Sequence, residues 1–338
     1  MKARRFFAAA IVLATLAVVP TFAQDDRGQI VDGWAFSVEP IFGARLGQCK
    51  EIVWGKSKTA GNYKLSELIY DITPAWYYGL DAQIQYKRFG VNLLSKFFIP
   101  SKSGRMTDSD WRNDADRNNG DTSTKTDYSE HDLFLGLNGG IGGYDLELQT
   151  DFRFYPTSFL TLAPLLSFNA QYLIFRAKNG IGYYGKETVS KIYPYDDASH
   201  RTVYDYDGMS VIDYDVYNFF IWTGLRADFL PCSWAKISLA SEVAVFSIML
   251  DFDNHIPRKI NFLDIAYSAF HAFRQTLKSE FKIKKFFSIC QKTVFLITGE
   301  SKGTEYSKMK GDSSYKNVGQ AGGQLMYVDL ELSLKFSW

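Results

Sequence analysis

The sequence predicts an all-β protein, a transmembrane antiparallel up-and-down β-barrel of about ten strands. Three observations carry this prediction. The C-terminal segment Met326–Trp338 alternates apolar and polar residues without a break, which is the period of a strand with one apolar face. The N-terminus has the composition of an export signal, and no later segment is an uninterrupted apolar run of membrane-helix length. In an exported protein, a closing strand that ends in an aromatic residue is typical of an outer-membrane barrel.

The first segment of the chain has the three parts of a secretory signal. Met1–Arg5 is basic, Phe6–Val19 is apolar, and Thr21–Ala23 supplies small residues before a cleavage site. The apolar part is shorter than the ~20 residues that span a membrane as a helix. We therefore expect residues 1–23 to be a signal peptide and residues 24–338 to form the barrel with extended extracellular loops.

Ten segments of the mature chain fit the strand pattern, an even number as bacterial barrels require. In chain order they are Trp34–Trp54, Leu65–Trp76, Leu80–Met106, Tyr144–Phe154, Phe159–Lys178, Ser210–Phe229, Ala235–Leu250, Ile260–Ile283, Ser288–Gly299 and Gln324–Trp338. A closed barrel satisfies every backbone hydrogen bond in lipid without helices.

Short turns alternate with long polar loops between these strands. The short turns are Tyr155–Ser158, Leu230–Ser233 and Lys284–Phe287, and the long loops are Lys56–Tyr63, Asp108–Gly143, Asn179–Met209, His255–Lys259 and Ser301–Gly323. This asymmetry is typical of the periplasmic and extracellular ends of a barrel. Glu130–Gly143 is ambiguous: we interpret it as part of the second long loop, with a membrane-spanning segment as the alternative.

Charge and cysteine content add little to the functional interpretation. The formal net charge is +1, which gives no electrostatic argument for a nucleic-acid partner. Cys49, Cys232 and Cys290 are widely spaced and lack the spacing of a metal site. Cys232 and Cys290 both fall near predicted turns, so a disulfide between them is one alternative. Small half-buried thiols are the favoured interpretation.

Two short stretches carry most of the functional information. Met106–Trp111 contains Asp108 and Asp110, and Asp251–His255 contains Asp251, Asp253 and His255. Acidic residues two positions apart point to one face of an extended strand. Both stretches lie at the predicted outer ends of their strands, so the fold can bring carboxylates around one imidazole. Such a cluster can hold and activate a water molecule.

Simpler interpretations of each stretch remain. An isolated Asp-x-Asp in a loop is usually solvated, and the Asp- and Asn-rich segment Asp108–Asp127 could instead bind Ca²⁺. That segment lacks the regular spacing of an EF-hand loop, so we predict no metal site. His131, His200 and His271 have no acidic residue two positions earlier, and we interpret them as surface or lumen residues.

Together these motifs resemble the omptins, a family of ten-stranded outer-membrane endopeptidases. Asp108-Ser109-Asp110-Trp111 is similar to the family's Asp-x-Asp-Trp motif, and Asp253-Asn254-His255 is similar to its Asp-x-His motif. Asp251 matches the acid that lines the family's primary specificity pocket, and Glu51, which follows Lys50, matches that acid's partner on the first strand. The resemblance covers essentially the whole mature chain.

The resemblance implies a peptide hydrolase that uses no covalent intermediate. Catalysis would fall to Asp108, Asp110, Asp253 and His255, and substrate binding to Glu51 and Asp251. Neutral His255 would take a proton from water, and Asp253 would orient its ring as the acid of a Ser-His-Asp triad does. A carboxylate pair binds Arg or Lys by charge-assisted hydrogen bonds, so we expect cleavage after basic residues.

The resemblance also sets expectations about setting and partners. We expect a monomer in the outer membrane with its active site facing the extracellular side, acting on peptides or proteins with basic residues. No cofactor is expected, except that lipopolysaccharide or another membrane lipid could act as an activator. Asp151 and Arg153 are superficially similar to part of a lipid-binding cluster, but they fall near the predicted turn Tyr155–Ser158. The alternatives are a non-enzymatic porin or adhesin, or an omptin-like barrel without activity.

Overall fold

The computed structural model describes residues 33–57, 61–112, 123–136, 140–188 and 191–338, and the expected signal peptide lies outside this part of the chain. No helix among these residues is long and apolar enough to cross a membrane. The strands are β1 (Trp34–Ser57), β2 (Gly61–Tyr86), β3 (Phe89–Phe98), β4 (Ser101–Asp110), β5 (Asp127–Leu135), β6 (Gly143–Phe152), β7 (Phe154–Thr157), β8 (Leu160–Gly185), β9 (Arg201–Asp205), β10 (Ser210–Cys232), β11 (Ala235–His255), β12 (Ile260–Ser268), β13 (Ala272–Lys284), β14 (Phe287–Thr298), β15 (Gly303–Met309) and β16 (Lys316–Ser337).

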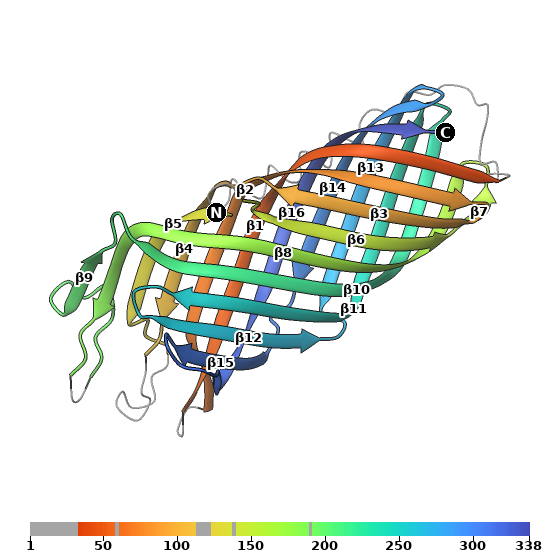
Figure 1. Cartoon of the computed structure of the whole chain (residues 1–338). Coiled ribbons are helices and arrows are strands. Elements are labelled where there is room, and N and C mark those ends of the chain that lie inside the picture. The colour runs from red at the N-terminus through yellow and green to blue at the C-terminus, as the bar shows by residue number, and fades with distance from the viewer. Residues whose placement is uncertain (1–32, 58–60, 113–122, 137–139, 189–190) are drawn as a thin grey trace.

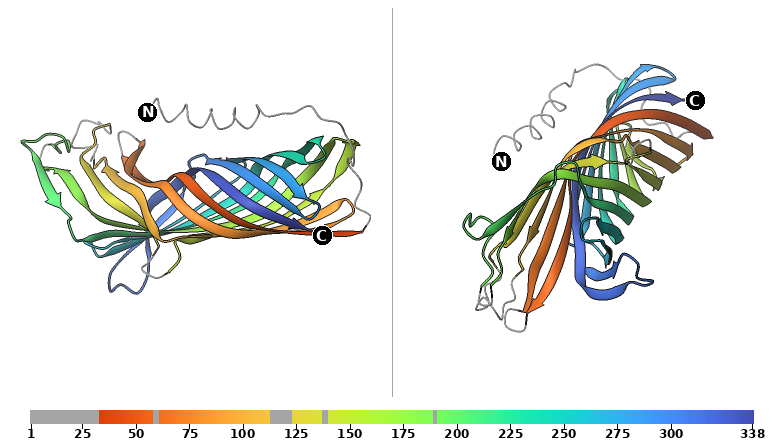
Figure 2. Two further views of the ribbon diagram at one scale, coloured as in Figure 1. Left: turned by 90° about the horizontal axis from the view of Figure 1, so that it is seen from above. Right: turned by 60° about the vertical axis from the view of Figure 1, so that its left-hand side comes forward.

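These strands close into one antiparallel barrel (Figures 1 and 2). β1 pairs with β2 on one side and with β16 on the other, which joins the two ends of the chain. Four positions in the wall are each shared by two consecutive strands: β3 with β4, β5 with β6, β12 with β13, and β14 with β15. Counting each such couple once, and leaving out the short β7 and β9 strands, gives the ten positions that the sequence predicts. The predicted fold class is confirmed.

One predicted strand boundary is wrong. Residues 80–86 were expected to begin the third strand, but β2 continues to Tyr86 and turns back at Lys87–Arg88 into β3. Lys87 has a φ of 52°, a left-handed conformation that Gly or Asn usually adopts. The turn therefore lacks the residues by which a tight hairpin is recognised in a sequence.

Much of the predicted loop sequence is paired strand. The segment Glu130–Gly143 supplies the end of β5, which pairs with β4 and β8, and the segment Ser301–Gly323 supplies β15 and the start of β16. The predicted loop His255–Lys259 is a four-residue turn, Ile256–Lys259. Strands that continue beyond the bilayer face water on both sides, so they need no apolar face and their sequences resemble loops.

The outer wall carries a broad apolar belt that ends before the long hairpins. Its exposed side chains include Phe36, Phe42, Leu80, Ile84, Leu93, Leu148, Leu166, Phe168, Leu225, Leu239, Phe246, Phe273, Leu332 and Leu334. Beyond the belt, Arg176 on β8 forms ion pairs with Asp213 and Asp215 on β10, at 3.3 and 2.7 Å. We call this end of the barrel the loop end. The opposite end, which carries the short turns and the C-terminus, is the turn end (Figure 1).

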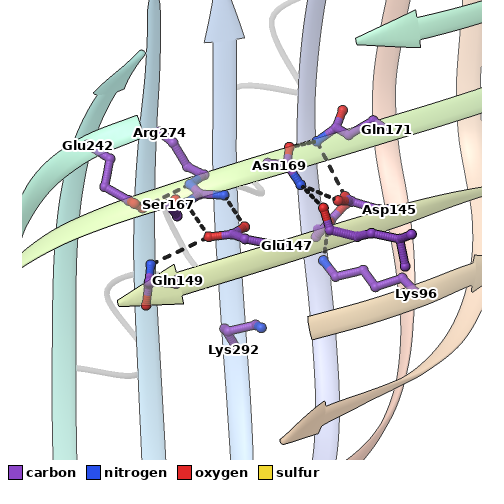
Figure 3. Close-up of polar contacts among 12 residues, drawn as sticks. Lys96, Asp145, Glu147, Gln149, Ser167, Asn169, Gln171, Glu242, Arg274 and Lys292 are labelled. Atoms are coloured by element: carbon purple, nitrogen blue, oxygen red, sulfur yellow. Dashed lines mark hydrogen bonds and ion pairs between the residues drawn. The ribbon is translucent and has the colours of Figure 1, made fainter. Parts of the chain in front are cut away.

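Ion pairs line the lumen within the belt (Figure 3). Arg45 is fully buried and contacts Asp329 through Nε and Asp145 through Nη2, both at 2.7 Å. Lys96 contacts Asp329 at 2.7 Å and Glu331 at 2.6 Å. A second centre is formed by Arg274, which bridges Glu147 and Glu242. Each of these buried carboxylates has a cationic partner, as low-dielectric burial demands.

The cysteines play no cross-linking role in this fold. Cys49, Cys232 and Cys290 are all buried and all free, so the alternative of a Cys232–Cys290 disulfide is wrong. The favoured interpretation of separate thiols stands.

Candidate active site

The two predicted motifs both lie at the loop end, beyond the apolar belt. Asp108 and Asp110 occupy the end of β4, and Asp253 and His255 occupy the end of β11. Alternate residues of a strand share a face, so each pair points together into the barrel. The His255 ring packs edge-on against Phe262 of β12, with ring centroids 5.3 Å apart, and this contact fixes its orientation.

His255 and Asp253 form a close pair. The Nε2 atom of His255 lies 2.6 Å from the Oδ2 atom of Asp253, and both residues are buried. An ionised carboxylate only accepts hydrogen bonds, so Nε2 carries the proton and Nδ1 keeps its lone pair. Burial alone would lower the pKa of His255, but the charge and hydrogen bond of Asp253 outweigh it and the pKa is raised. The ring is therefore a base whose strength is increased by its partner.

Asp108 and Asp110 form a second, repulsive pair. Burial and the neighbouring Asp110 raise the pKa of Asp108 to about 7, although His255 and Arg258 act in the opposite direction. The Oδ1 atom of Asp108 is buried without a hydrogen-bond partner. Near neutral pH this carboxyl therefore exists in both its protonated and its ionised form, which suits a group that exchanges protons or hydrogen bonds with a substrate.

Arg258 links the two sides of this cluster. It extends from the β11–β12 turn, and its Nη2 atom lies 3.9 Å from the Oδ2 atom of Asp110 on β4. Asp108 and Asp110 are the main charges that raise the pKa of Arg258. The structure therefore brings the four predicted catalytic residues into one group, which we call the Asp–His cluster: Asp108, Asp110, Asp253 and His255.

The predicted pocket residues lie next to the Asp–His cluster. Glu51 on β1 and Asp251 on β11 are both buried and point inward. Tyr214 donates its hydroxyl hydrogen bond to Oδ2 of Asp251 at 3.1 Å, and its ring is stacked on Tyr70 at 4.3 Å. Burial and the charges of Asp253 and Asp251 raise the pKa of Glu51 well above its ordinary value. The pocket thus holds carboxylates with little compensation.

A family model matches most of this chain. The model of the Omptin family matches residues 34–338, nearly all of the chain. The chain belongs to the Omptin family. No curated protein matches its sequence.

A solved structure shares the fold of this omptin. The crystal structure of the outer membrane protease OmpT from Escherichia coli is similar with a TM-score of 0.76 and 14% identity, covering 90% of this chain and 97% of that one. Ail of Yersinia pestis covers 91% of this chain and 100% of its own at 10% identity, with a TM-score of only 0.27. The similarity to OmpT shows a shared barrel architecture.

Three residues that sequence reasoning missed belong to the site of this omptin. Nothing in the sequence indicated Arg258 as a site residue, because its segment is predicted to be a long loop. Asp264 on β12 lies directly opposite Asp251, and Glu305 on β15 lies directly opposite Asp264. The first of these pairings could have been found, because the tight turn after His255 fixes the register of the hairpin. Glu305 was hidden in a segment expected to be a loop.

A serine and a histidine next to Asp108 were also missed. Ser129 on β5 lies opposite Asp108, and its Oγ atom is 2.9 Å from Nε2 of His131. The other ring nitrogen of His131 lies 2.5 Å from the carbonyl oxygen of Asn179, so Nδ1 donates and Nε2 accepts from Ser129. His131 is therefore a buried lumen residue that holds the serine beside Asp108.

The calcium alternative lies only partly within the described chain. Residues 113–122 of Asp108–Asp127 are outside it. Within the described residues, no three His, Cys, Asp or Glu side chains are arranged to hold a metal ion. Asp127 instead accepts hydrogen bonds from the Nη2 atom of Arg112 and from the backbone of Gly185.

Proposed function

We propose that this omptin is an outer-membrane endopeptidase that hydrolyses extracellular peptides and proteins after Arg or Lys. The observation that carries the proposal is the 2.6 Å pair of His255 and Asp253 gathered with Asp108 and Asp110 beside an uncompensated acidic pocket. The arrangement supplies a base, a group that orients it, carboxyls to hold water, and a subsite for a cation.

The proposed reaction begins with water held between His255 and the Asp108–Asp110 pair. His255 Nδ1 takes one proton as the water oxygen bonds to the peptide carbonyl carbon, and Asp253 stabilises the imidazolium that results. The C–N bond then breaks, and the imidazolium returns the proton to the leaving amine. No covalent enzyme intermediate forms.

Asp108 has a second part in this scheme. A negative charge develops on the carbonyl oxygen during attack, and two ionised carboxylates beside it would oppose the reaction. The protonated form of Asp108, available because its pKa is about 7, can donate a hydrogen bond to that oxygen. Repulsion by the neighbouring Asp110 keeps the proton on Asp108 available for this role.

The proposal also covers the orientation, the oligomeric state and the lipid environment of the barrel. We infer that the loop end faces the extracellular side, that the protein acts as a monomer, and that outer-membrane lipid surrounds the apolar belt. Asp151 and Arg153 do not form a lipid site on the outer wall: Asp151 is buried in the lumen, where Arg153 pairs with it at 2.8 Å. If a lipid activates the enzyme, other residues bind it.

The test compares the mature protein, refolded in detergent with and without lipopolysaccharide, with its His255→Ala variant on peptides that contain one Arg or Lys. Cleavage after the basic residue by the wild type alone is the expected result. The matched control is His200→Ala, because His200 also pairs with an aspartate, Asp197 at 3.1 Å, but on an exposed loop. Equal background cleavage by all three proteins under both conditions contradicts the proposal. Stable open-channel steps in planar bilayers would instead indicate a porin.

A further inference from the structure

Four carboxylates, rather than two, meet beside the Asp–His cluster. Glu51, Asp251, Asp264 and Glu305 form what we call the four-carboxylate cluster. Asp251, Asp264 and Glu305 are directly opposed on the neighbouring strands β11, β12 and β15, so their side chains share the inner face. Glu51 reaches the same region from β1, and the other three charges all act on it.

No cation balances this cluster. Among the described residues, none of its members forms an ion pair with Lys or Arg, although each lies at most 8% exposed. Four of its oxygens are buried without any hydrogen-bond partner: Glu51 Oε2, Asp251 Oδ1, and both Oδ atoms of Asp264. Unpaired buried acceptors cost free energy, so a cluster of them requires a ligand that donates hydrogen bonds.

The neighbouring strand β16 presents only small residues beside two of the carboxylates. β16 places Gly323 opposite Glu51 and Gly319 opposite Glu305, with the small residue Ala321 between them. A Cβ atom at Gly319 would lie 3.1 Å from Glu305 Oε2. Beside Glu51 the place is already filled, because a Cβ atom at Gly323 would lie 2.7 Å from Sδ of Met249 on β11. Beside Glu305, no other described side chain lies within 4 Å of a Cβ atom at Gly319, so a ligand side chain can approach the cluster there.

The number of donors distinguishes the two basic side chains. A guanidinium group carries five N–H donors in a planar fork, whereas an ammonium group carries three. Four orphaned oxygens exceed what one ammonium group can satisfy, but they lie within the capacity of a guanidinium group. Asp264 supplies two of these four oxygens. Without Asp264 only two oxygens lack a partner, and the three donors of an ammonium group would satisfy them.

We propose that Asp264, with Glu305 beside it, is a specificity-determining residue that makes the pocket select arginine over lysine at the cleaved bond. The inference rests on the proposed function, since it names the side chain that the pocket of the peptidase accepts. It also makes a claim about binding alone, which holds or fails without any cleavage.

The first measurement is of cleavage. The ratio of kcat/KM for two peptides that differ only in Arg or Lys at the cleaved position is compared in the wild type, Asp264→Asn and Asp264→Ser. We expect the preference for Arg to fall about tenfold in both variants, because an unsatisfied buried donor or acceptor costs about one factor of ten. Asp312→Asn removes one carboxylate from the exposed β15–β16 turn and serves as the control, with an unchanged ratio.

The second measurement is of binding by the uncleaving His255→Ala protein. Calorimetry in detergent compares argininamide with lysinamide, with and without Asp264→Asn in the same protein. Arg-selective binding that Asp264→Asn abolishes supports the inference even if the wild type cleaves nothing, in which case only the proposed function fails. Cleavage with an Arg-to-Lys ratio that neither Asp264 variant changes overturns the inference and leaves the function intact.

Folding of each variant is checked by the resistance of the unheated barrel to unfolding in SDS. If the Asp264 variants do not fold, Glu305→Gln provides the same comparison from the next strand, with a smaller expected loss of the Arg preference. An unchanged preference in a folded Glu305→Gln protein then counts against the inference. Absence of binding to either amide by the wild-type pocket overturns it outright.

Discussion

The lumen within the apolar belt and the four-carboxylate cluster at the loop end are both buried and rich in carboxyl groups, yet only the lumen pairs its carboxylates with cations. In the belt, Arg45 pairs with Asp145 and Asp329. Lys96 and Arg274 pair with the other carboxylates that they contact (Figure 3). At the loop end, Glu51, Asp251 and Asp264 retain buried oxygens without partners. The first arrangement is what a stable barrel requires.

This difference in charge pairing indicates where the chain gives up stability in order to bind a ligand. Buried carboxyl groups without hydrogen-bond partners reduce stability, and such groups gather at functional sites. The lumen ion pairs compensate one another and need no further cation. The uncompensated cluster is complete only when a cation enters it. Four experiments can break or sharpen this comparison.

The largest expected effect is on catalysis. Replacing His255 with Ala removes the proposed base, and kcat/KM should fall by about 10²- to 10⁴-fold, the range that a general base contributes. Peptide cleavage measured at pH 7 checks it, with the barrel shown to be folded. A fall of less than a few fold would place the base elsewhere.

The next effect is on stability in the belt. Arg45→Met leaves the carboxylates of Asp145 and Asp329 without their shared partner, and the free energy of unfolding should drop by about 3–5 kcal/mol. Arg105→Met is the control, because Arg105 is exposed and its pair with Glu130 at 3.2 Å should contribute under about 1 kcal/mol. Denaturant unfolding in detergent compares them, and equal losses would show that lumen charges are not structural.

Removal of a buried ionisable group should have the opposite effect on stability at the loop end. Asp264→Asn removes one of several mutually repelling carboxylates and should stabilise the barrel by about 1 kcal/mol, as functional-site substitutions often do. The same unfolding measurement applies. A destabilisation as large as that of Arg45→Met would mean that Asp264 has a structural partner, and the contrast between the two regions would fail.

The smallest expected effect is a shift in pH dependence. Arg258 lowers the pKa of both Asp108 and His255, so Arg258→Ala should raise both pKa values and move the whole pH–rate profile to higher pH. Because Arg258 is half exposed, screening should hold the shift below about one unit. Arg258→Lys, which keeps the charge, should leave the profile near its original position. A shift to lower pH would show that Arg258 does not face the Asp–His cluster.

Local patterns in the sequence predict the strands and the residues that share a face of each strand. The alternation of Met326–Trp338 predicts a lipid-facing strand because side chains of a strand point to opposite faces, and Asp253-Asn254-His255 predicts a shared face for the same reason. Both predictions depend only on neighbours along one strand, and β16 and β11 contain them. The turn at Lys87 was missed because its left-handed residue is a lysine.

Only the tertiary structure determined which residues of neighbouring strands lie opposite each other. Strands predicted as loops, such as β15, are polar because water rather than lipid surrounds them, so their sequences do not show their pairing. The register of β11, β12 and β15 places Asp251, Asp264 and Glu305 in one row, and closure of the barrel brings Glu51 to them. A sequence determines which residues share a strand face. The shear of the closed barrel determines which faces meet, and here it determines that four carboxylates meet without a cation.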